Sequence, residues 1–172
     1  MSKDTKTIWL FRGPAPDVYV NAYEEETLEK VENERSMSVK SAVEGINLTK
    51  KYLLRFNRVI LAGNTRTEQW ANILLINSDK PLSSTMYNIM PESDLIARMC
   101  VETSREHILV VFGRELIINT AVKITQDLTI RSIDLDFCEG IRINLPNGDF
   151  EKISPNARKK SLHNTNPSSQ NH

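Results

Sequence analysis

The sequence predicts an α+β fold, in which a single compact domain is built on a twisted, mainly antiparallel sheet with one main helix. Three observations support this prediction. The chain has 172 residues, of which 40% are hydrophobic, and this suits one domain with a core of its own. Apolar and polar residues alternate over residues 128–137 and 141–145, as they do in half-buried strands. The clearest helical pattern is a single one, over residues 91–106.

Composition divides the chain into three parts. Residues 1–35 are expected to form a flexible N-terminal arm with an apolar anchor and an acidic segment. Residues 36–153 are expected to form the globular α+β domain, and residues 154–172 a disordered polar tail. The sequence has no signal-peptide pattern and no apolar run of roughly 18–20 residues, so neither secretion nor a transmembrane segment is expected.

The arm carries an isolated apolar segment, Ile8 to Phe11, followed by Pro14 and Pro16. The prolines block a helix and favour extended backbone. Two interpretations stay open: the segment is an edge strand of the chain's own sheet, or it inserts into a groove on another copy. The acidic residues 24–35 predict only a marginal, solvated helix.

The predicted domain begins with a short amphipathic helix capped by Ser36 or Ser38. The main helix follows later, where Pro91, Glu92 and Asp94 suit a first turn. The apolar runs around them predict strands over residues 51–62, 70–76, 108–112, 116–124, 128–137 (with a bulge at 131–132), 141–145 and 150–153. Asn147-Gly148 predicts a hairpin between the last two strands.

Charge is balanced overall, with 22 basic and 22 acidic residues, which argues against a protein dominated by nucleic-acid binding. Residues 46–67 nevertheless contain no acid, and their basic residues interleave with Tyr52 and Phe56. This stretch is either a patch for the phosphates of RNA or of anionic lipid, or an ordinary strand whose basic side chains face water. The candidate anionic-surface residues are Lys50, Lys51, Arg55, Arg58 and Arg66.

The sequence shows no catalytic signature. Cys100 and Cys138 lie in apolar runs, and a pairing of either one with His107 is not fixed by any spacing. Asp134 and Asp136 could form a carboxylate pair, but a solvated strand face is the preferred interpretation. Clustered metal ligands and a glycine-rich phosphate loop are absent from the sequence, so no catalytic residue, cofactor or metal is predicted.

The layout resembles the small matrix proteins of rhabdoviruses, especially those of plant-infecting members. The matching features are the chain length, the arm with Pro14-Ala15-Pro16-Asp17-Val18-Tyr19, a compact domain from about residue 36 to 153, and the basic residues of 52–61. This resemblance implies self-association and bridging between a nucleocapsid and a membrane.

The leading hypothesis is therefore a non-enzymatic, self-associating structural protein of matrix type in the host cytoplasm, at a membrane periphery or in the virion. Its expected partners are other copies of itself, a nucleocapsid or RNA, and an anionic membrane surface. The predicted self-association residues are Ile8, Trp9, Leu10, Phe11 and Tyr19. Two alternatives stay open: a small RNA-binding or regulatory viral accessory protein, and a small enzyme with an unrecognised site.

Overall fold

The computed structural model describes residues 5–17, 34–78 and 83–156. Six strands of these residues form one mixed sheet in the order β3-β2-β4-β1-β5-β6. In chain order the elements are β1 (Lys6–Arg12), α2 (Val39–Lys51), β2 (Arg58–Ala62), α3 (Thr65–Leu74), β3 (Ser83–Tyr87), α4 (Ser93–Glu102), β4 (His107–Phe112), α5 (Arg114–Thr125), a 3-10 helix (Leu128–Ser132), β5 (Gly140–Leu145) and β6 (Asp149–Ile153). Strands β3, β2, β4 and β1 are mutually parallel, whereas β5 runs antiparallel to β1 and to β6.

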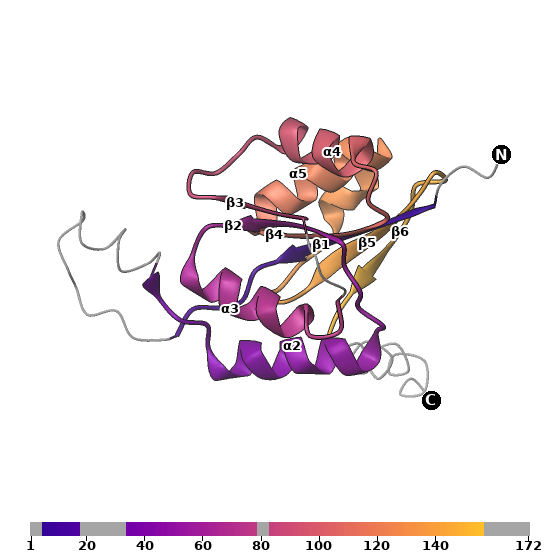
Figure 1. Cartoon of the computed structure of the whole chain (residues 1–172). Helices are drawn as coiled ribbons and strands as arrows, with labels where there is room; N and C mark the ends of the chain where they lie inside the picture. Colours follow the sequence, from indigo (N-terminus) through magenta and orange to yellow (C-terminus); the bar gives the residue numbers. More distant parts are fainter. Residues whose placement is uncertain (1–4, 18–33, 79–82, 157–172) are drawn as a thin grey trace, which may run out of the picture.

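The helices cover both faces of the sheet, which gives three layers (Figure 1). Helices α2 and α3 cover one face, and α4 and α5 cover the other. Parallel strands joined by helices need cover on both faces, and this accounts for the layered arrangement.

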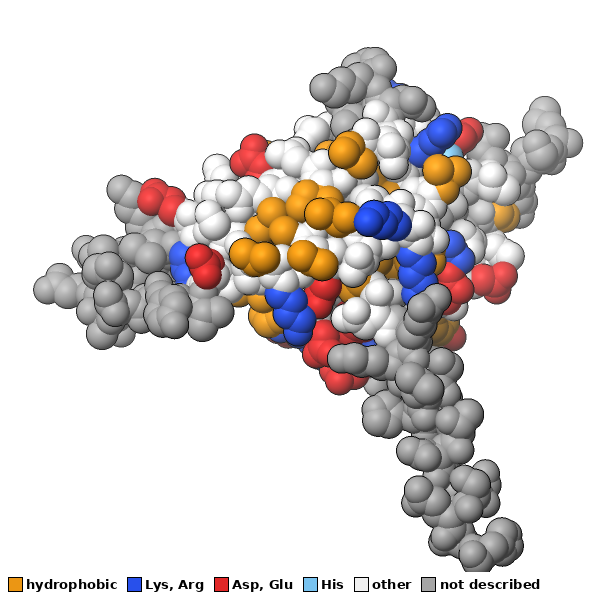
Figure 2. Space-filling view, turned by 90° about the horizontal axis from the view of Figure 1, so that it is seen from below, with side chains coloured by type: hydrophobic (Ala, Val, Ile, Leu, Met, Phe, Trp, Pro, Cys, Tyr) orange, Lys and Arg blue, Asp and Glu red, His pale blue; other side chains and the backbone are white. Residues whose placement is uncertain are grey.

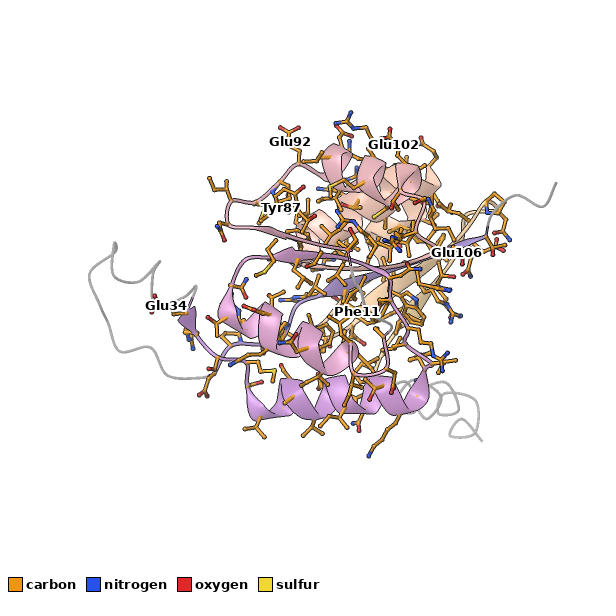
Figure 3. All side chains as sticks on the ribbon, viewed as in Figure 1. Phe11, Glu34, Tyr87, Glu92, Glu102 and Glu106 are labelled. Carbon is orange, nitrogen blue, oxygen red and sulfur yellow. The ribbon has the colours of Figure 1, made fainter. Side chains whose placement is uncertain are left out.

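Strand β1 lies inside this sheet, between β4 and β5. Its apolar residues alternate between the two faces: Ile8 and Leu10 belong to the α4/α5 core, and Trp9 and Phe11 to the α2/α3 core. Phe11 points into the layer between the sheet and α3 (Figure 3). The two-sided burial explains why residues 8–11 are all apolar instead of alternating.

The structure corrects two predictions of the fold. The sheet is mixed, whereas a mainly antiparallel sheet was predicted. Four α-helices lie within the described residues, whereas one main helix was predicted. Residues 70–76 and 116–124 were expected as strands but form parts of α3 and α5. Helix α3 buries Thr67, Trp70, Ala71 and Leu74 at helical spacing. Helix α5 buries six of its twelve residues, and only a narrow polar stripe of Glu115, Asn119 and Lys123 marks its outer side.

Of two further strand predictions, the one over 51–62 is wrong in part and the one over 128–137 is wrong throughout. The strand expected over 51–62 is limited to β2, since α2 extends to Lys51 and an irregular segment follows. Residues 128–137 form a 3-10 helix followed by a loop. Asp127 caps this helix by accepting a hydrogen bond from the Thr129 N–H at 2.9 Å. The predictions of α4, β4, β5, β6, the 147–148 turn and the Ser38 cap are confirmed.

The described part of the predicted arm contributes β1 to the sheet and then contacts the start of α2. The chain after β1 is fixed there by a bridge between Pro16 and Met37 and by the Ala15 N–H, which donates to Ser41 Oγ at 2.9 Å. The acidic segment 24–33 and residues 157–172 of the predicted tail lie outside the described residues.

Candidate functional site

The four parallel strands all end at the same side of the sheet. This side, where the carboxyl ends of the strands lie, is called the carboxyl edge here and is the candidate site. The register sets the ends of neighbouring strands side by side, with Arg12 of β1 opposite Phe112 of β4 and Ala62 of β2 opposite Tyr87 of β3. In open α/β sheets, ligands bind at the carboxyl ends of the strands, where the following helices begin. Helices α3 and α5 both begin at this edge.

A glycine follows three of these strands, at Gly13, Gly63 and Gly113. The Gly13 N–H donates to the Phe112 carbonyl oxygen at 2.9 Å, and a Cβ at Gly13 would lie 3.5 Å from Thr67 Oγ1. The end of β1 therefore lies against both β4 and the first turn of α3.

Arginine side chains are grouped at the same edge. The half-buried Arg12 donates from Nη1 to the Leu135 carbonyl oxygen at 2.7 Å, and its guanidinium lies 4.0 Å from the centroid of the Phe137 ring. Arg114, which is exposed, donates from Nη2 to the Ile133 carbonyl oxygen at 3.3 Å. The segment 133–137 thus holds both guanidinium groups beside the ends of β1 and β4.

The first turns of α3 and α5 supply backbone N–H donors at this edge, in addition to the arginine side chains. Asn64 caps α3 by accepting a hydrogen bond from the Thr67 N–H at 2.9 Å, and Arg66 lies in the same first turn. Helix α5 starts after Gly113 without a side-chain cap, and its first residues Arg114 and Glu115 are exposed. The first N–H groups of a helix carry partial positive charge and bind anions well. With the arginines, they make this edge chemically suited to an oxyanion.

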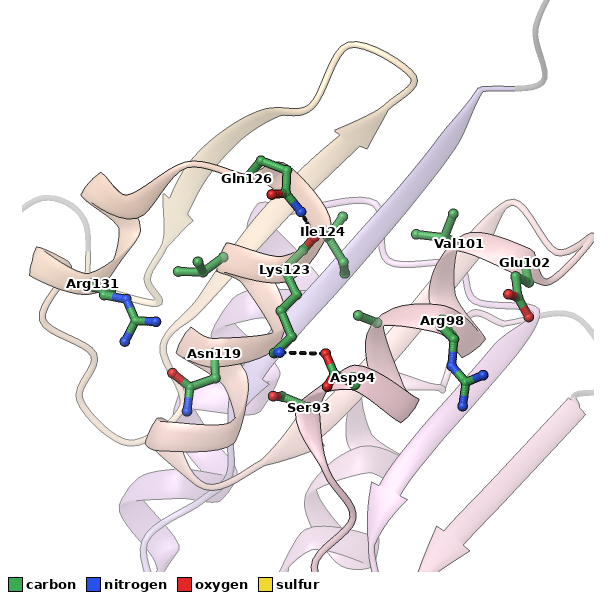
Figure 4. A pocket seen from close by; sticks show the side chains of 12 residues that line it. Ser93, Asp94, Arg98, Val101, Glu102, Asn119, Lys123, Ile124, Gln126 and Arg131 are labelled. Atoms are coloured by element: carbon green, nitrogen blue, oxygen red, sulfur yellow. Dashed lines mark hydrogen bonds and ion pairs between the residues drawn. The ribbon is translucent and has the colours of Figure 1, made fainter.

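A groove lies between α4 and α5, away from the arginines of the carboxyl edge (Figure 4). This groove has a volume of about 1120 Å³, and its walls are joined by an ion pair between Lys123 Nζ and Asp94 Oδ1 at 2.5 Å. Its lining contains carboxylates, amides and cations, but no histidine or cysteine.

The residues predicted for self-association lie elsewhere. Ile8, Trp9, Leu10 and Phe11 are at most 6% exposed inside the chain's own sheet, so in this fold they offer no surface to another copy. Of the two interpretations of the anchor, insertion into the chain's own sheet is the one observed, as a central and not an edge strand. Tyr19 lies outside the described residues.

The residues predicted for an anionic surface are divided between two ends of the domain. Lys50, Lys51 and Arg55 are exposed where α2 ends and before β2 begins. Arg58 is half-buried and donates to Ser83 Oγ and Thr85 Oγ1 of β3, at 3.0 and 2.7 Å. Arg66 lies beyond the other end of β2, at the candidate site. The structure therefore does not bring the five into one patch.

Of the polar groups singled out in the sequence, His107 lies away from the site, whereas Asp134 and Asp136 lie in the segment that holds the two arginines. His107 begins β4 and so lies at the opposite edge of the sheet. Asp134 and Asp136 are exposed in the loop after the 3-10 helix, not on a strand. Within residues 5–17, 34–78 and 83–156, no group of three or more histidine, cysteine, aspartate or glutamate side chains could hold a metal ion.

Both cysteines are buried, and burial raises the pKa of the Cys100 and Cys138 thiols to about 12. We expect neither to react with an aromatic disulfide reagent at about pH 8 in the folded protein, because the thiolate is the reacting form. After unfolding in guanidinium, the ordinary pKa of about 8.5 returns and both should react within minutes. Release of the coloured thiolate, followed with and without denaturant, measures this. Fast labelling of the native chain would contradict the buried placement.

Sequence reasoning missed Arg12, Asn64 and Arg114. A signal for them exists: Arg12-Gly13, Gly63-Asn64 and Gly113-Arg114 each follow an apolar strand and place a polar residue beside a glycine. The pattern is informative only once the three strands are known to be parallel, because antiparallel strands would send these residues to different edges.

No family model matches the chain, and no curated protein matches it either. Among solved structures, a protein from Agrobacterium tumefaciens described as phosphohistidine phosphatase SixA is similar with a TM-score of 0.65 and 9% identity, covering 85% of this chain and 97% of that one. The protein histidine phosphatase SixA complexed with tungstate gives 0.61 and 14%, covering 87% and 97%. Phosphoserine phosphatase from Entamoeba histolytica in complex with 3-phosphoglyceric acid gives 0.57 and 7%, covering 87% and 95%.

These similarities correct the sequence-based assignment. The predicted membership in the rhabdovirus matrix family is wrong, because the fold that the chain shares is that of phosphatases. The prediction of a non-enzymatic, matrix-like virion protein, which rested on that resemblance, is overturned with it. In the part of the chain that the structure describes, no helix is both long and apolar enough to span a bilayer.

Proposed function

We propose that this protein is a small enzyme of phosphate-ester chemistry that holds the phosphate group of its substrate at the carboxyl edge of β1, β2 and β4. The observation that carries the proposal is the grouping of Arg12, Arg66 and Arg114 with the first turns of α3 and α5 at that edge. Similar solved structures were captured with tungstate and with 3-phosphoglyceric acid, an oxyanion and a phosphate ester. This supports phosphate as the group recognised.

The two arginines with described partners would do different work. Arg12 is held in place by Leu135 and Phe137, so its planar guanidinium is ordered before a ligand arrives. Arg114 is exposed and stands at the start of α5, where its charge adds to that of the helix N-terminus. Transfer of a phosphoryl group depends largely on such positioning and on charge stabilisation.

The attacking group is not among the residues named for binding. At the described edge neither a histidine nor a reactive thiol is present, since His107 lies at the other edge and both cysteines are buried. Arg12 and Arg114 therefore account for binding of the phosphate group but not for its release. The two have to be measured separately.

Replacing Arg114 with alanine is expected to weaken tungstate binding by about ten- to a hundredfold, because a hydrogen bond to a charged group contributes about 1.5–3 kcal/mol. Arg12→Lys should also weaken it, since lysine cannot reproduce the planar fork. Arg98→Ala, which removes an exposed arginine from the α4/α5 groove, is the matched control and should bind as the wild type does. Isothermal titration at constant ionic strength measures all four proteins.

Release of inorganic phosphate from phosphoserine and from 3-phosphoglycerate is then assayed on the same samples. Release that is lost in Arg114→Ala and kept in Arg98→Ala would support the whole proposal. Binding without release from any phosphate ester tested would overturn the enzymatic part and leave the binding site. Equal affinity of wild type and Arg114→Ala, or no binding at all, would overturn the site.

A further inference from the structure

Helix α2 packs its more polar side against the domain, although a surface helix normally buries its apolar side. Its buried residues are Ser41, Glu44, Gly45 and Leu48, so three of the four are polar or lack a side chain. Trp70 of α3 explains this choice. Its indole Nε1 donates to the Ser41 carbonyl oxygen at 3.1 Å, and a Cβ at Gly45 would lie only 2.8 Å from the same Nε1. The close approach of α3 requires small residues on this side of α2.

The opposite side of α2 is apolar and faces solvent. Val39, Val43 and Ile46 are 82%, 50% and 43% exposed, and their spacing places them on one stripe along the helix. Lys50 continues the same stripe. Viewed from the α2 side, hydrophobic side chains gather in the middle of the molecule (Figure 2). A surface helix normally turns such a stripe toward the core, so a stripe facing water indicates an interaction surface.

The charges beside this stripe are basic. Lys40, Lys50, Lys51 and Arg55 are all exposed, and residues 39–55 contain one acid, Glu44. Glu44 is buried, and its Oε1 lies 4.0 Å from Lys40 Nζ. A partner at the outer face of α2 therefore meets apolar side chains flanked by a net positive charge.

These charges argue against a second copy as the occupant. In an antiparallel two-fold pairing, Lys40 of one α2 faces Lys50 and Lys51 of the other, and in a parallel pairing Lys50 faces Lys50. Either arrangement places like charges around the apolar contact. The stripe also lacks the tryptophan, phenylalanine or leucine typical of helices that lie in a membrane surface.

We propose that the outer face of α2, defined by Val39, Val43, Ile46 and Lys50, is a docking surface for an amphipathic helix of a partner protein that carries acidic residues beside its own apolar stripe. The apolar stripes of the two helices would exclude water between them, and the acidic residues would pair with Lys40, Lys50 and Lys51 at the rim. This surface lies on α2, away from the proposed phosphate site, and does not depend on that site.

The test uses the full chain and two synthetic, fluorescently labelled helical peptides. Both carry leucines at helical spacing, and they differ only in having glutamates or lysines beside the leucines. The glutamate peptide is expected to bind, and the lysine peptide to bind at least about tenfold more weakly, a difference that should shrink as salt is raised. Fluorescence anisotropy measures both affinities.

Two matched variants locate the surface. Val43→Glu should weaken binding of the glutamate peptide at least about tenfold. Val101→Glu changes a valine of α4 that is 49% exposed, against 50% for Val43, and should leave binding unchanged. Circular dichroism and melting of both variants exclude unfolding as the cause, and Lys50→Glu, which keeps the stripe, tests the charge alone.

The possible results divide clearly. No binding of the glutamate peptide up to about 1 mM, or equal binding by Val43→Glu, would overturn the proposal. A dimer in sedimentation equilibrium that Val43→Glu converts to monomer would identify a second copy as the occupant and would also overturn it. Binding to vesicles of phosphatidylcholine and phosphatidylserine that depends on Val43, without peptide binding, would assign the surface to a membrane instead.

Discussion

Replacing Phe11 with alanine is expected to lower the free energy of unfolding by about 3–5 kcal/mol, a substantial part of the about 5–15 kcal/mol typical of a folded domain. The Phe11 ring is completely buried and lies 5.4 Å from the ring of Trp70 and 6.2 Å from that of Trp9, measured between centroids. Its loss removes a buried aromatic contact at the centre of the sheet and leaves a cavity between the sheet and α3. Urea denaturation followed by tryptophan fluorescence measures the change.

Phe137→Ala is the matched control, because Phe137 is 43% exposed and should cost far less stability when it is truncated. The interpretation of residues 8–11 as an intermolecular anchor leads to the opposite expectation, namely unchanged stability and smaller oligomers. A Phe11→Ala protein as stable as the wild type would therefore show that β1 is not the central strand.

Gly140→Val is expected to prevent folding or to lower the melting temperature by well over 10 °C. A Cβ at Gly140 would lie 2.4 Å from the Leu10 carbonyl oxygen and 3.1 Å from the Phe11 Cα, which are backbone atoms of the neighbouring strand. Backbone cannot move aside as a flexible side chain can, so β5 would have to separate from β1. Even Gly140→Ala should cost about 3 kcal/mol, the upper part of the range for overpacked sites.

Gly113→Ala is the control for this substitution. A Cβ at Gly113 would meet nothing within 4 Å, and its φ of −68° suits any residue. This variant should be neutral or more stable by about 0.4–1 kcal/mol, because alanine reduces the freedom of the unfolded chain. Thermal unfolding followed by circular dichroism compares the variants, and equal melting temperatures for Gly140→Ala and the wild type would contradict the pairing of β5 with β1.

The elements that the sequence predicted correctly are those with local signals. Pro91 and Asp94 mark the start of α4, Ser38 caps α2, and Asn147-Gly148 joins β5 to β6. The errors concern apolar segments with little polar face. Strand β4 is a continuous apolar run, and the apolar residues of α5 outnumber its narrow polar stripe, so both segments look like buried strands. Only the tertiary arrangement distinguishes them.

The candidate site could not be predicted for the same reason. Arg12 and Arg114 are far apart in sequence, and neither has a motif around it that indicates phosphate binding. They come together because β1 and β4 are parallel neighbours. The stretch 46–67 was a prominent charge pattern, but α2 and β2 place its basic residues at two ends of the domain.

The central position of β1 has a consequence for how this protein is made. Thr7 pairs with His107, and Phe11 pairs with Gly140, so the partners of β1 leave the ribosome long after β1 itself. Until then the apolar segment Ile8–Phe11 has no strand to pair with and is exposed to other chains. Pairings between distant segments also slow folding. Synthesis of this protein should therefore depend on chaperone protection of β1 until β4 and β5 have emerged.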